Sequence, residues 1–408
     1  MTQAIPLKQR PAFRLAATAL LALALIVTMV ALQTPATSVR HTGPRDSNEV
    51  VATLHTGGRA YPAELRALLQ AARAAPDDAV AAKAASRALI GEGRAAGDGR
   101  LVGASLGLLR PFMATNDAEV LTLAATARQY QHDFPGALTL LDQALLLTPD
   151  DANALLIRAT IHIVRGEFDA ARSDCKRISV LPRPDLGFLC AATAETLTAK
   201  APAIYKKLAV LSEQPQIFDP ALRPYALSLM GEIAALQGQN DLAIQHFTDL
   251  LTNDPGDIRV RLMLADLLLQ AKKPTDVLAL LTPAPDVDGV LIRRYLAANA
   301  LNQANIAGPA QVELEKRFRL NLDLGLTAHA REEAQYFLYV APDPALALAR
   351  AQINWGLQHE IDDLRLLINA AVAANQPAAV APALKWMADA GIVVPTLIIP
   401  DAVREAAK

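Results

Sequence analysis

Apolar residues recur at helical spacing through the middle of the chain, and their pattern repeats with a period of about 34 residues. The clearest unit begins near Pro224 and places Gly231 in its first helical segment. One period after Gly231 the chain has Ala265, and one period after Ala125 it has Ala159. Because one helix pair cannot bury its own apolar face, this period predicts antiparallel helix pairs that stack into an array.

The period is interrupted once. The interval from Ala171 to Ala243 is slightly longer than two periods. One degenerate pair with a long loop, near residues 190–214, fits this interval. His132 and Gly166 lie one period apart. We expect both at the turn between the two helices of a pair.

The unit at Pro224 resembles a tetratricopeptide repeat (TPR), whose pattern is W-x2-L-G-x2-Y, then A-x3-F, then P. Four positions match by identity and three by an apolar residue; these are Gly231, Ala243, Phe247 and Pro255, and Leu227, Met230 and Ala234. The resemblance implies an all-α, TPR-like α-solenoid of antiparallel helix pairs. Over most of its length the chain also resembles bacterial TPR proteins with an N-terminal signal or anchor, through residues 93–100, 131–134, 329–332 and 354–358.

The regions before and after the repeats keep apolar residues at helical spacing, but they do not follow the repeat period. We expect helices and a glycine-rich turn before the repeats, at 61–75, 77–90, 91–99 (the turn) and from Leu101. After Pro285 we expect six helices and a partly ordered tail, at 290–302, 311–324, 328–340, 344–357, 361–374, 377–390 and 391–408. The folded part then divides into a helical cap at 59–110, TPR repeats at 111–285 and a repeat-like helical region at 286–408.

The N-terminus carries an apolar segment with a basic leader. Residues 15–32 are apolar apart from two threonines, and Lys8, Arg10 and Arg14 precede them. A helix of this length spans about 27 Å, close to the hydrocarbon core of a bilayer. Two interpretations stay open: an uncleaved transmembrane anchor, or a signal peptide cleaved near Ala31 or Ala36.

Both interpretations make residues 1–14 a cytoplasmic leader and 33–58 a linker. The remaining chain would lie in the periplasm, free or anchored to the inner membrane through residues 15–32.

Composition and charge narrow the function classes. Hydrophobic residues make up 52% of the chain and aromatic residues only 4%, which favours closely packed, alanine-rich helices. The net charge of −2 gives no basic excess for a nucleic acid. We therefore expect protein partners and no nucleic acid.

The two cysteines fall on helices that the TPR resemblance places side by side. Cys175 takes position 24 of one unit, in its second helix, and Cys190 lies in the first helix of the next. Outside the cytoplasm thiols tend to oxidise, so we predict a Cys175–Cys190 disulfide. The alternative is two buried free thiols.

Candidate catalytic and metal motifs lack their required context. Ser105 lies in a G-x-S-x-G pattern, but no strand precedes it. Residues 286–289 match only the start of a calcium loop, and the seven histidines show no metal-ligand spacing. We expect no enzyme activity, cofactor or metal.

Binding of another protein is the favoured function. The TPR register directs a mixed, mildly polar set of side chains to the concave face: Glu119, Thr122, Thr126, Gln129, Asn153, Leu156, Thr160, Tyr225, Ser228, Glu232, Arg259, Leu262 and Asp266. This set lacks the dense Lys/Arg clamp used for acidic C-terminal tails. We expect an extracytoplasmic scaffold in a bacterial envelope complex. The alternative is a helical accessory region or subunit of an envelope enzyme or transporter.

Overall fold

The computed structural model describes residues 61–408. The expected leader (1–14), signal or anchor (15–32) and linker (33–58) lie outside the described residues. Within residues 61–408, none of the helices has the length and apolar character needed to cross a bilayer.

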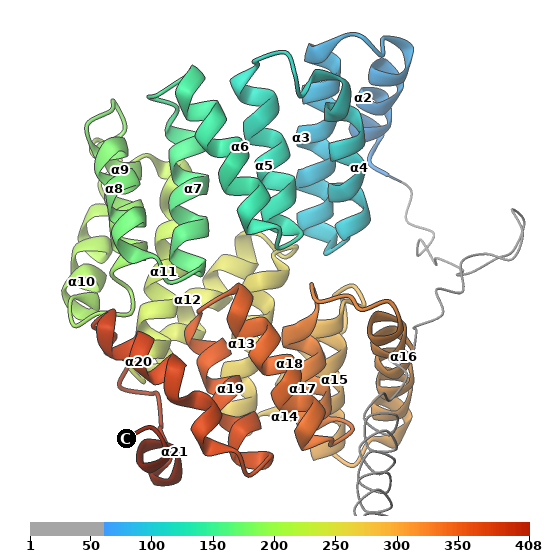
Figure 1. Cartoon of the computed structure of the whole chain (residues 1–408), viewed down its shortest axis with the longest axis vertical. Helices are drawn as coiled ribbons and strands as arrows, with labels where there is room; N and C mark the ends of the chain where they lie inside the picture. The colour runs from blue at the N-terminus through green and yellow to red at the C-terminus, as the bar shows by residue number, and fades with distance from the viewer. Residues whose placement is uncertain (1–60) are drawn as a thin grey trace, which may run out of the picture. The chain divides into compact units, whose positions relative to one another are not determined.

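Regular structure in the described part of the chain is entirely helical (Figure 1). The elements are α2 (Ala63–Ala74), α3 (Ala79–Ala96), α4 (Gly99–Leu109), η1 (Arg110–Phe112), α5 (Ala118–Tyr130), α6 (Phe134–Leu147), α7 (Ala152–Val164), α8 (Phe168–Ser179), α9 (Pro184–Ala194), α10 (Ala201–Leu211), η2 (Pro220–Leu222), α11 (Arg223–Leu236), α12 (Asn240–Asn253), α13 (Ile258–Gln270), α14 (Pro274–Leu281), α15 (Asp288–Ala300), α16 (Ala304–Asp323), α17 (Ala330–Tyr339), α18 (Pro344–Leu357), α19 (Ile361–Ala373), η3 (Pro377–Val380), α20 (Ala381–Asp389) and α21 (Asp401–Ala406). This confirms the expected all-α, TPR-like solenoid for the described residues. The boundaries at 110 and 285 stay predictions.

Successive helices pack as pairs, and we call the first helix of each pair an A helix and the second a B helix. The pairs are α3/α4, α5/α6, α7/α8, α11/α12, α13/α14, α15/α16 and α17/α18. The degenerate pair is α9 and α10, where α9 packs mainly on α8 and α10 packs on α11. The expected long loop follows α10 and contains η2.

Aspartates mark the starts of helical segments at the repeat period. Asp117, Asp151, Asp185 and Asp219 follow one another at this period, and the side chain of each accepts a main-chain N–H at or near a helix start. Such bonds satisfy amides that have no partner within the helix. This second periodic signal is independent of the apolar pattern.

The turns inside the pairs share one conformation. His132 (φ 59°) and Gly166 (φ 72°) both adopt the left-handed conformation directly after an A helix. In each turn the next residue donates its N–H to the helix, Asp133 to Arg128 O and Glu167 to His162 O. This is the Schellman ending of a helix, and it confirms the expected turn positions.

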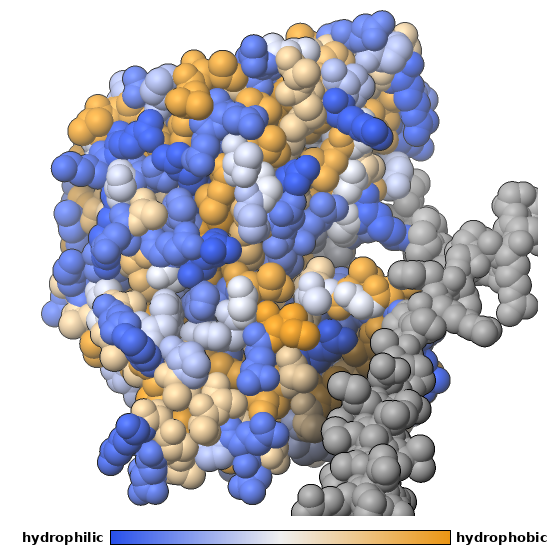
Figure 2. Space-filling model, in the orientation of Figure 1, coloured by the Kyte–Doolittle hydropathy of each residue, from blue (hydrophilic) through white to orange (hydrophobic). Residues whose placement is uncertain are grey.

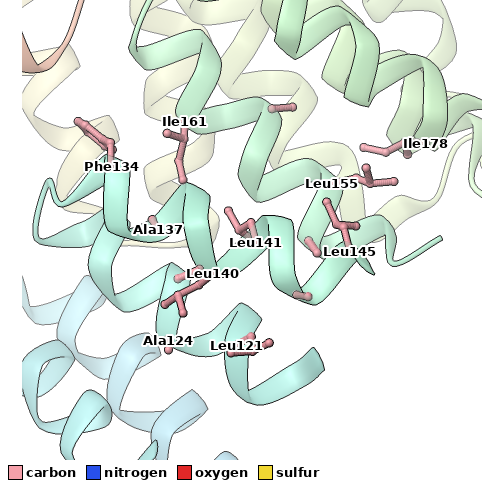
Figure 3. Close-up of a cluster of buried hydrophobic side chains, with 14 of the residues drawn as sticks. Leu121, Ala124, Phe134, Ala137, Leu140, Leu141, Leu145, Leu155, Ile161 and Ile178 are labelled. Carbon is pink, nitrogen blue, oxygen red and sulfur yellow. The ribbon is translucent and has the colours of Figure 1, made fainter. Parts of the chain in front are cut away.

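A small residue of one A helix lies against a larger residue of its B helix: Gly231 of α11 sits against the ring of Phe247 in α12. Three other repeats carry a small and a larger residue at the same spacing, all buried: Ala125 and Leu141, Ala159 and Cys175, and Ala265 and Leu281. Figure 3 shows the surrounding apolar cluster, in which Leu121 of α5, Leu141 of α6, Leu155 of α7 and Ile178 of α8 contribute to one core. The pairs α5/α6 and α7/α8 therefore share one apolar core.

Three expected boundaries are wrong. The glycine-rich turn at 91–99 is mostly helical: α3 continues to Ala96, because Gly93 lets it pack closely on Val102 of α4. Helix α16 begins at Ala304 instead of residue 311 and runs through Pro309. The expected helix 377–390 is divided into η3 and α20.

Residues 330–408, which we call the C-terminal lobe, have their own apolar core. It contains Leu364, Leu367 and Val380, all at most 1% exposed. Figure 1 shows α20 lying below α8 and α10, near the ends of A helices from the middle of the chain. In the same view, apolar surface gathers over α19 to α21 (Figure 2). The chain thus returns on itself, so repeats far apart in sequence come together.

Candidate functional site

The predicted surface residues on α5 and α7 divide into buried and accessible ones. Thr122 and Thr126 are buried, and their hydroxyls donate to the carbonyls of Ala118 and Thr122 at 2.8 Å. Thr160 donates in the same way to Leu156 O at 2.8 Å. These three hydroxyls are satisfied within their own helices.

The other predicted residues of α5 and α7 reach the surface. Asn153 is exposed, and Gln129 and Leu156 are partly exposed. Glu119 is also exposed and forms ion pairs with Arg87 and with Lys83 of α3, the latter at 2.9 Å. These four side chains give the first half of the solenoid a mixed polar and apolar face.

Predicted residues on α11 and α13 join neighbouring A helices. Glu232 of α11 accepts from Arg259 of α13 at 2.8 Å, and Asp266 of α13 accepts twice from Arg293 of α15, at 2.7 and 2.6 Å. Each acid precedes its arginine by 27 residues. The second pair lies one period after the first, so the ion pair is part of the repeat.

The three remaining predicted residues also contact neighbouring elements. Ser228 accepts from Arg259 of α13 at 3.3 Å, and the hydroxyl of Tyr225 lies 2.7 Å from that of Thr193 in α9. Leu262 lies against Gly289 of α15, where an added Cβ would come within 3.0 Å of its Cδ1. These side chains hold adjacent pairs in register.

Acids of the C-terminal lobe act electrostatically on the arginines of these ion pairs. Glu232 raises the pKa of Arg259, and Glu360, at the start of α19, adds to the shift. Burial opposes a raised pKa at Arg293, but Asp266 and then Glu332 of α17 and Asp362 of α19 outweigh it. The arginines of α13 and α15 thus interact both with the acids that pair with them and with acids of the C-terminal lobe.

A buried ionic cluster inside the lobe was not predicted. Arg331 of α17 donates to both oxygens of Asp363 in α19 at 2.7 Å and also pairs with Glu360. The Asn354 amide donates to Asp363 at 2.6 Å. Burial raises the pKa of Asp363 to about 6, against the opposing effect of Arg331.

A sequence signal for this cluster exists. Glu360 and Asp363 form a capping box at the start of α19, a pattern that can be read from a helix start with an acid three residues later. Its partner Arg331 lies 32 residues earlier than Asp363. Only the stacking of α17 on α19 brings that arginine to the box.

The predicted disulfide is present between Cys175 of α8 and Cys190 of α9. Their Cα atoms are 5.3 Å apart and both residues are 1% exposed. It joins the regular pair α7/α8 to the degenerate one.

The catalytic motif considered above lies in a helix. Ser105 is buried in α4 and donates to Val102 O at 2.6 Å, so it has no elbow geometry. Across residues 61–408, no three His, Cys, Asp or Glu side chains come together as a metal site. The absence of enzyme activity and cofactors stays a prediction.

Comparisons with known proteins match two segments. Models of the tetratricopeptide repeat match residues 122–179 and 234–301. A search of curated proteins found no match.

Solved structures of low similarity were also found. A tetratricopeptide repeat protein from Parabacteroides merdae shares 16% identity, with 62% of this chain and 93% of that chain covered and a TM-score of 0.37. The Cut9–Hcn1 hetero-tetramer of the APC/C shares 13% identity, with 85% of this chain and 66% of that chain covered and a TM-score of 0.47. The P58(IPK) TPR domain shares 13% identity, with 85% of this chain and 96% of that chain covered and a TM-score of 0.22.

The two matched segments cover α5 to α8 and the helices from the end of α11 into α15. They include three of the four small and large residue pairs described above and the Asp266–Arg293 ion pair, while Gly231 and Glu232 lie just before the second segment. Residues 122–179 and 234–301 of the chain are therefore tetratricopeptide repeats.

Proposed function

We propose that the protein is an extracytoplasmic scaffold that holds another protein in a bacterial envelope complex. Tetratricopeptide repeats indicate protein–protein interaction, and this observation carries the scaffold role. Two features support the location. Residues 15–32 have the pattern of a signal or anchor, and the buried Cys175–Cys190 disulfide suits an oxidising compartment.

The contact surface that we propose lies on α5 and α7. Asn153, Gln129 and Leu156 are accessible there, and as uncharged side chains they hold no ion pair that a partner would have to break. Glu119 adds a charge at the edge of this face. By contrast, the predicted residues on α11 and α13 already bind neighbouring helices. A partner can therefore engage α5 and α7 without rearranging the repeats.

A pull-down from native membranes tests the scaffold role. We would compare the full chain with N153R/L156A, which changes the α7 face, and with Q143R, which adds the same charge at an exposed site on α6. We expect one stoichiometric envelope protein with the full chain and Q143R, and much less with N153R/L156A. Equal recovery with all three would contradict the surface. A partner-free protein carrying a small molecule would favour the enzyme or transporter accessory.

Thiol trapping in intact cells tests the compartment. Rapid acid quenching followed by a maleimide label should leave both cysteines unlabelled until a reductant is added. Two labelled cysteines without reductant would contradict an oxidising location for the folded part.

A further inference from the structure

Helix α16 is longer than the helix with which it pairs. It has 20 residues and α15 has 13, so α16 is about 10 Å longer at the rise of an α-helix. The alignment of the two helices is fixed by Arg317, which donates to Asp286 O at 2.7 Å and to Asp288 at 2.9 Å, where α15 begins. The last residues of α16 and the turn after them therefore project beyond the start of α15.

The projecting end is apolar. Leu320, Leu324 and Leu326 are 49%, 51% and 45% exposed, and we call these three residues the leucine tip. Gly325 (φ 65°) ends the helix, and Leu326 donates its N–H to Asn321 O at 2.9 Å, which is a Schellman ending. Such an ending favours an apolar contact between positions 326 and 320. Half of each leucine nevertheless stays exposed, and Leu324 takes no part in that contact.

The described chain begins at the same end of the molecule. Leu65, in the first turn of α2, shares an apolar cluster with Leu101 at the start of α4. In the turn between α3 and α4, a Cβ added at Gly97 would lie 2.5 Å from Cγ1 of Val287, which directly precedes α15. Figure 1 accordingly shows α2, α3, α4 and α16 along one side. Residue 61 and the leucine tip thus lie on the same side of the folded part.

A lipid surface fits this end better than a second protein does. Stable protein interfaces bury about 800 Å² on each partner, and three half-exposed leucines offer only a small part of that area. A bilayer interface has no such requirement, because a projecting apolar end can enter it while the rest of the surface stays in water. The exposed charges around the tip balance, with Lys316 and Arg319 against Glu315 and Asp323, so the contact would be apolar.

We propose that the leucine tip enters the headgroup region of the bilayer to which residues 15–32 anchor the chain. An anchored chain meets the bilayer at a high effective concentration, so a tip too small to bind alone can stay engaged. Together, the anchor and the tip would fix which side of the folded part faces the membrane. The inference rests on the proposed function, because it takes the membrane anchor from it.

A dye at one tip position tests the contact. The two native cysteines form a disulfide, so L324C can be labelled alone with nitrobenzoxadiazole. The matched control is V372C, whose parent residue is 47% exposed on α19. The full chain with either label is inserted into vesicles of phosphatidylethanolamine and phosphatidylglycerol, with or without brominated acyl chains that quench the dye. Circular dichroism checks the fold, and L320C replaces L324C if that variant does not fold.

We expect brominated lipid to lower the emission of the label at position 324 about twofold and to leave the label at position 372 unchanged. Equal quenching at both positions, or none at position 324, would overturn the proposal. Emission at position 324 that follows the protein-to-lipid ratio instead of the bromine would place a second copy at the tip and would also overturn it. Because the neighbouring charges balance, quenching should persist at high salt. Its loss there would assign the contact to Lys316 and Arg319 instead of the leucines.

These outcomes are separate from the test of the scaffold role. A chain that does not sediment with the vesicles would contradict the membrane anchor and the tip contact together. A vesicle-bound chain with an unquenched label at position 324 would contradict the tip contact alone. Neither result bears on the pull-down, which measures partner binding through α5 and α7.

Discussion

Gly231 offers a direct test of how the repeats are packed. An added Cβ would lie 2.5 Å from the ring of Phe247 and would meet two more of its atoms at 2.9 Å. Real Cβ atoms do not approach so closely, so the helices α11 and α12 must separate. Overpacking of this kind costs about 1–3 kcal/mol, whereas replacing glycine by alanine inside a helix gains about 1 kcal/mol. We expect G231A to destabilise this pair by about 1 kcal/mol.

The other repeats supply the compensating change. Ala125, Ala159 and Ala265 occupy the position of Gly231 in their repeats, and the position of Phe247 is Leu or Cys there. The variant F247L alone should lose about 1 kcal/mol of ring packing. The double variant G231A/F247L recreates the Ala265–Leu281 combination. It should be at least as stable as F247L, because the overlap is gone and the helix propensity is improved.

Hydrogen exchange of α11 and α12 is the suitable assay, because a repeat array can open locally and a single melting temperature would average over its parts. Urea unfolding provides an independent value. A G231A protein more stable than the parent would show that helix propensity alone governs the site. Strictly additive effects in the double variant would refute the paired-size explanation.

Three further changes have definite expectations. C175A/C190A should lower the stability of α8 and α9 by about 3 kcal/mol, since the bridge closes a loop of 15 residues; hydrogen exchange under non-reducing conditions would measure it, and an unchanged rate would contradict it. D363N should destabilise α17 and α19 by about 3 kcal/mol, because it removes the charged partner of Arg331 in a largely buried ion pair. Urea unfolding at pH 7 would show this loss of stability, and an unchanged unfolding free energy would contradict it. Burial and then the cations Arg331 and His329 lower the pKa of His132. Folding therefore favours the neutral imidazole, and stability is lost as the pH falls below about 6.5. The variant H132N, which tolerates the turn conformation, should weaken this loss of stability between pH 7 and 5, and an unchanged pH profile would contradict it.

The repeat register could be read from the sequence because its determinants are local. Small residues at fixed positions, prolines after B helices and turn residues such as His132 and Gly166 act over distances shorter than one repeat. The disulfide could be predicted for the same reason, since Cys175 and Cys190 lie on consecutive helices. The register also predicted which positions point outward. It did not predict whether each of those side chains is free for a partner or bonded to a neighbouring helix.

The use of those positions depended on neighbours one repeat away. Glu232, Arg259 and Asp266 were expected on a binding face, and the structure places them in ion pairs between A helices. Thr122 and Thr126 were expected at the surface and are buried, because the adjacent A helices pack closely enough to cover them. A periodic pattern gives the direction of a side chain but not what lies opposite it.

The sequence by itself determined the helices, their pairing and the disulfide, because each depends on contacts within about one repeat. The return of the C-terminal lobe was decided by the tertiary structure alone. Small rotations between successive pairs accumulate along the solenoid, and no local pattern encodes their sum. That sum brings Trp386 to Gly166 across 220 residues and sets Glu360 near Arg259. The physical reason is that packing between pairs sets the curvature, and the curvature decides which distant faces meet.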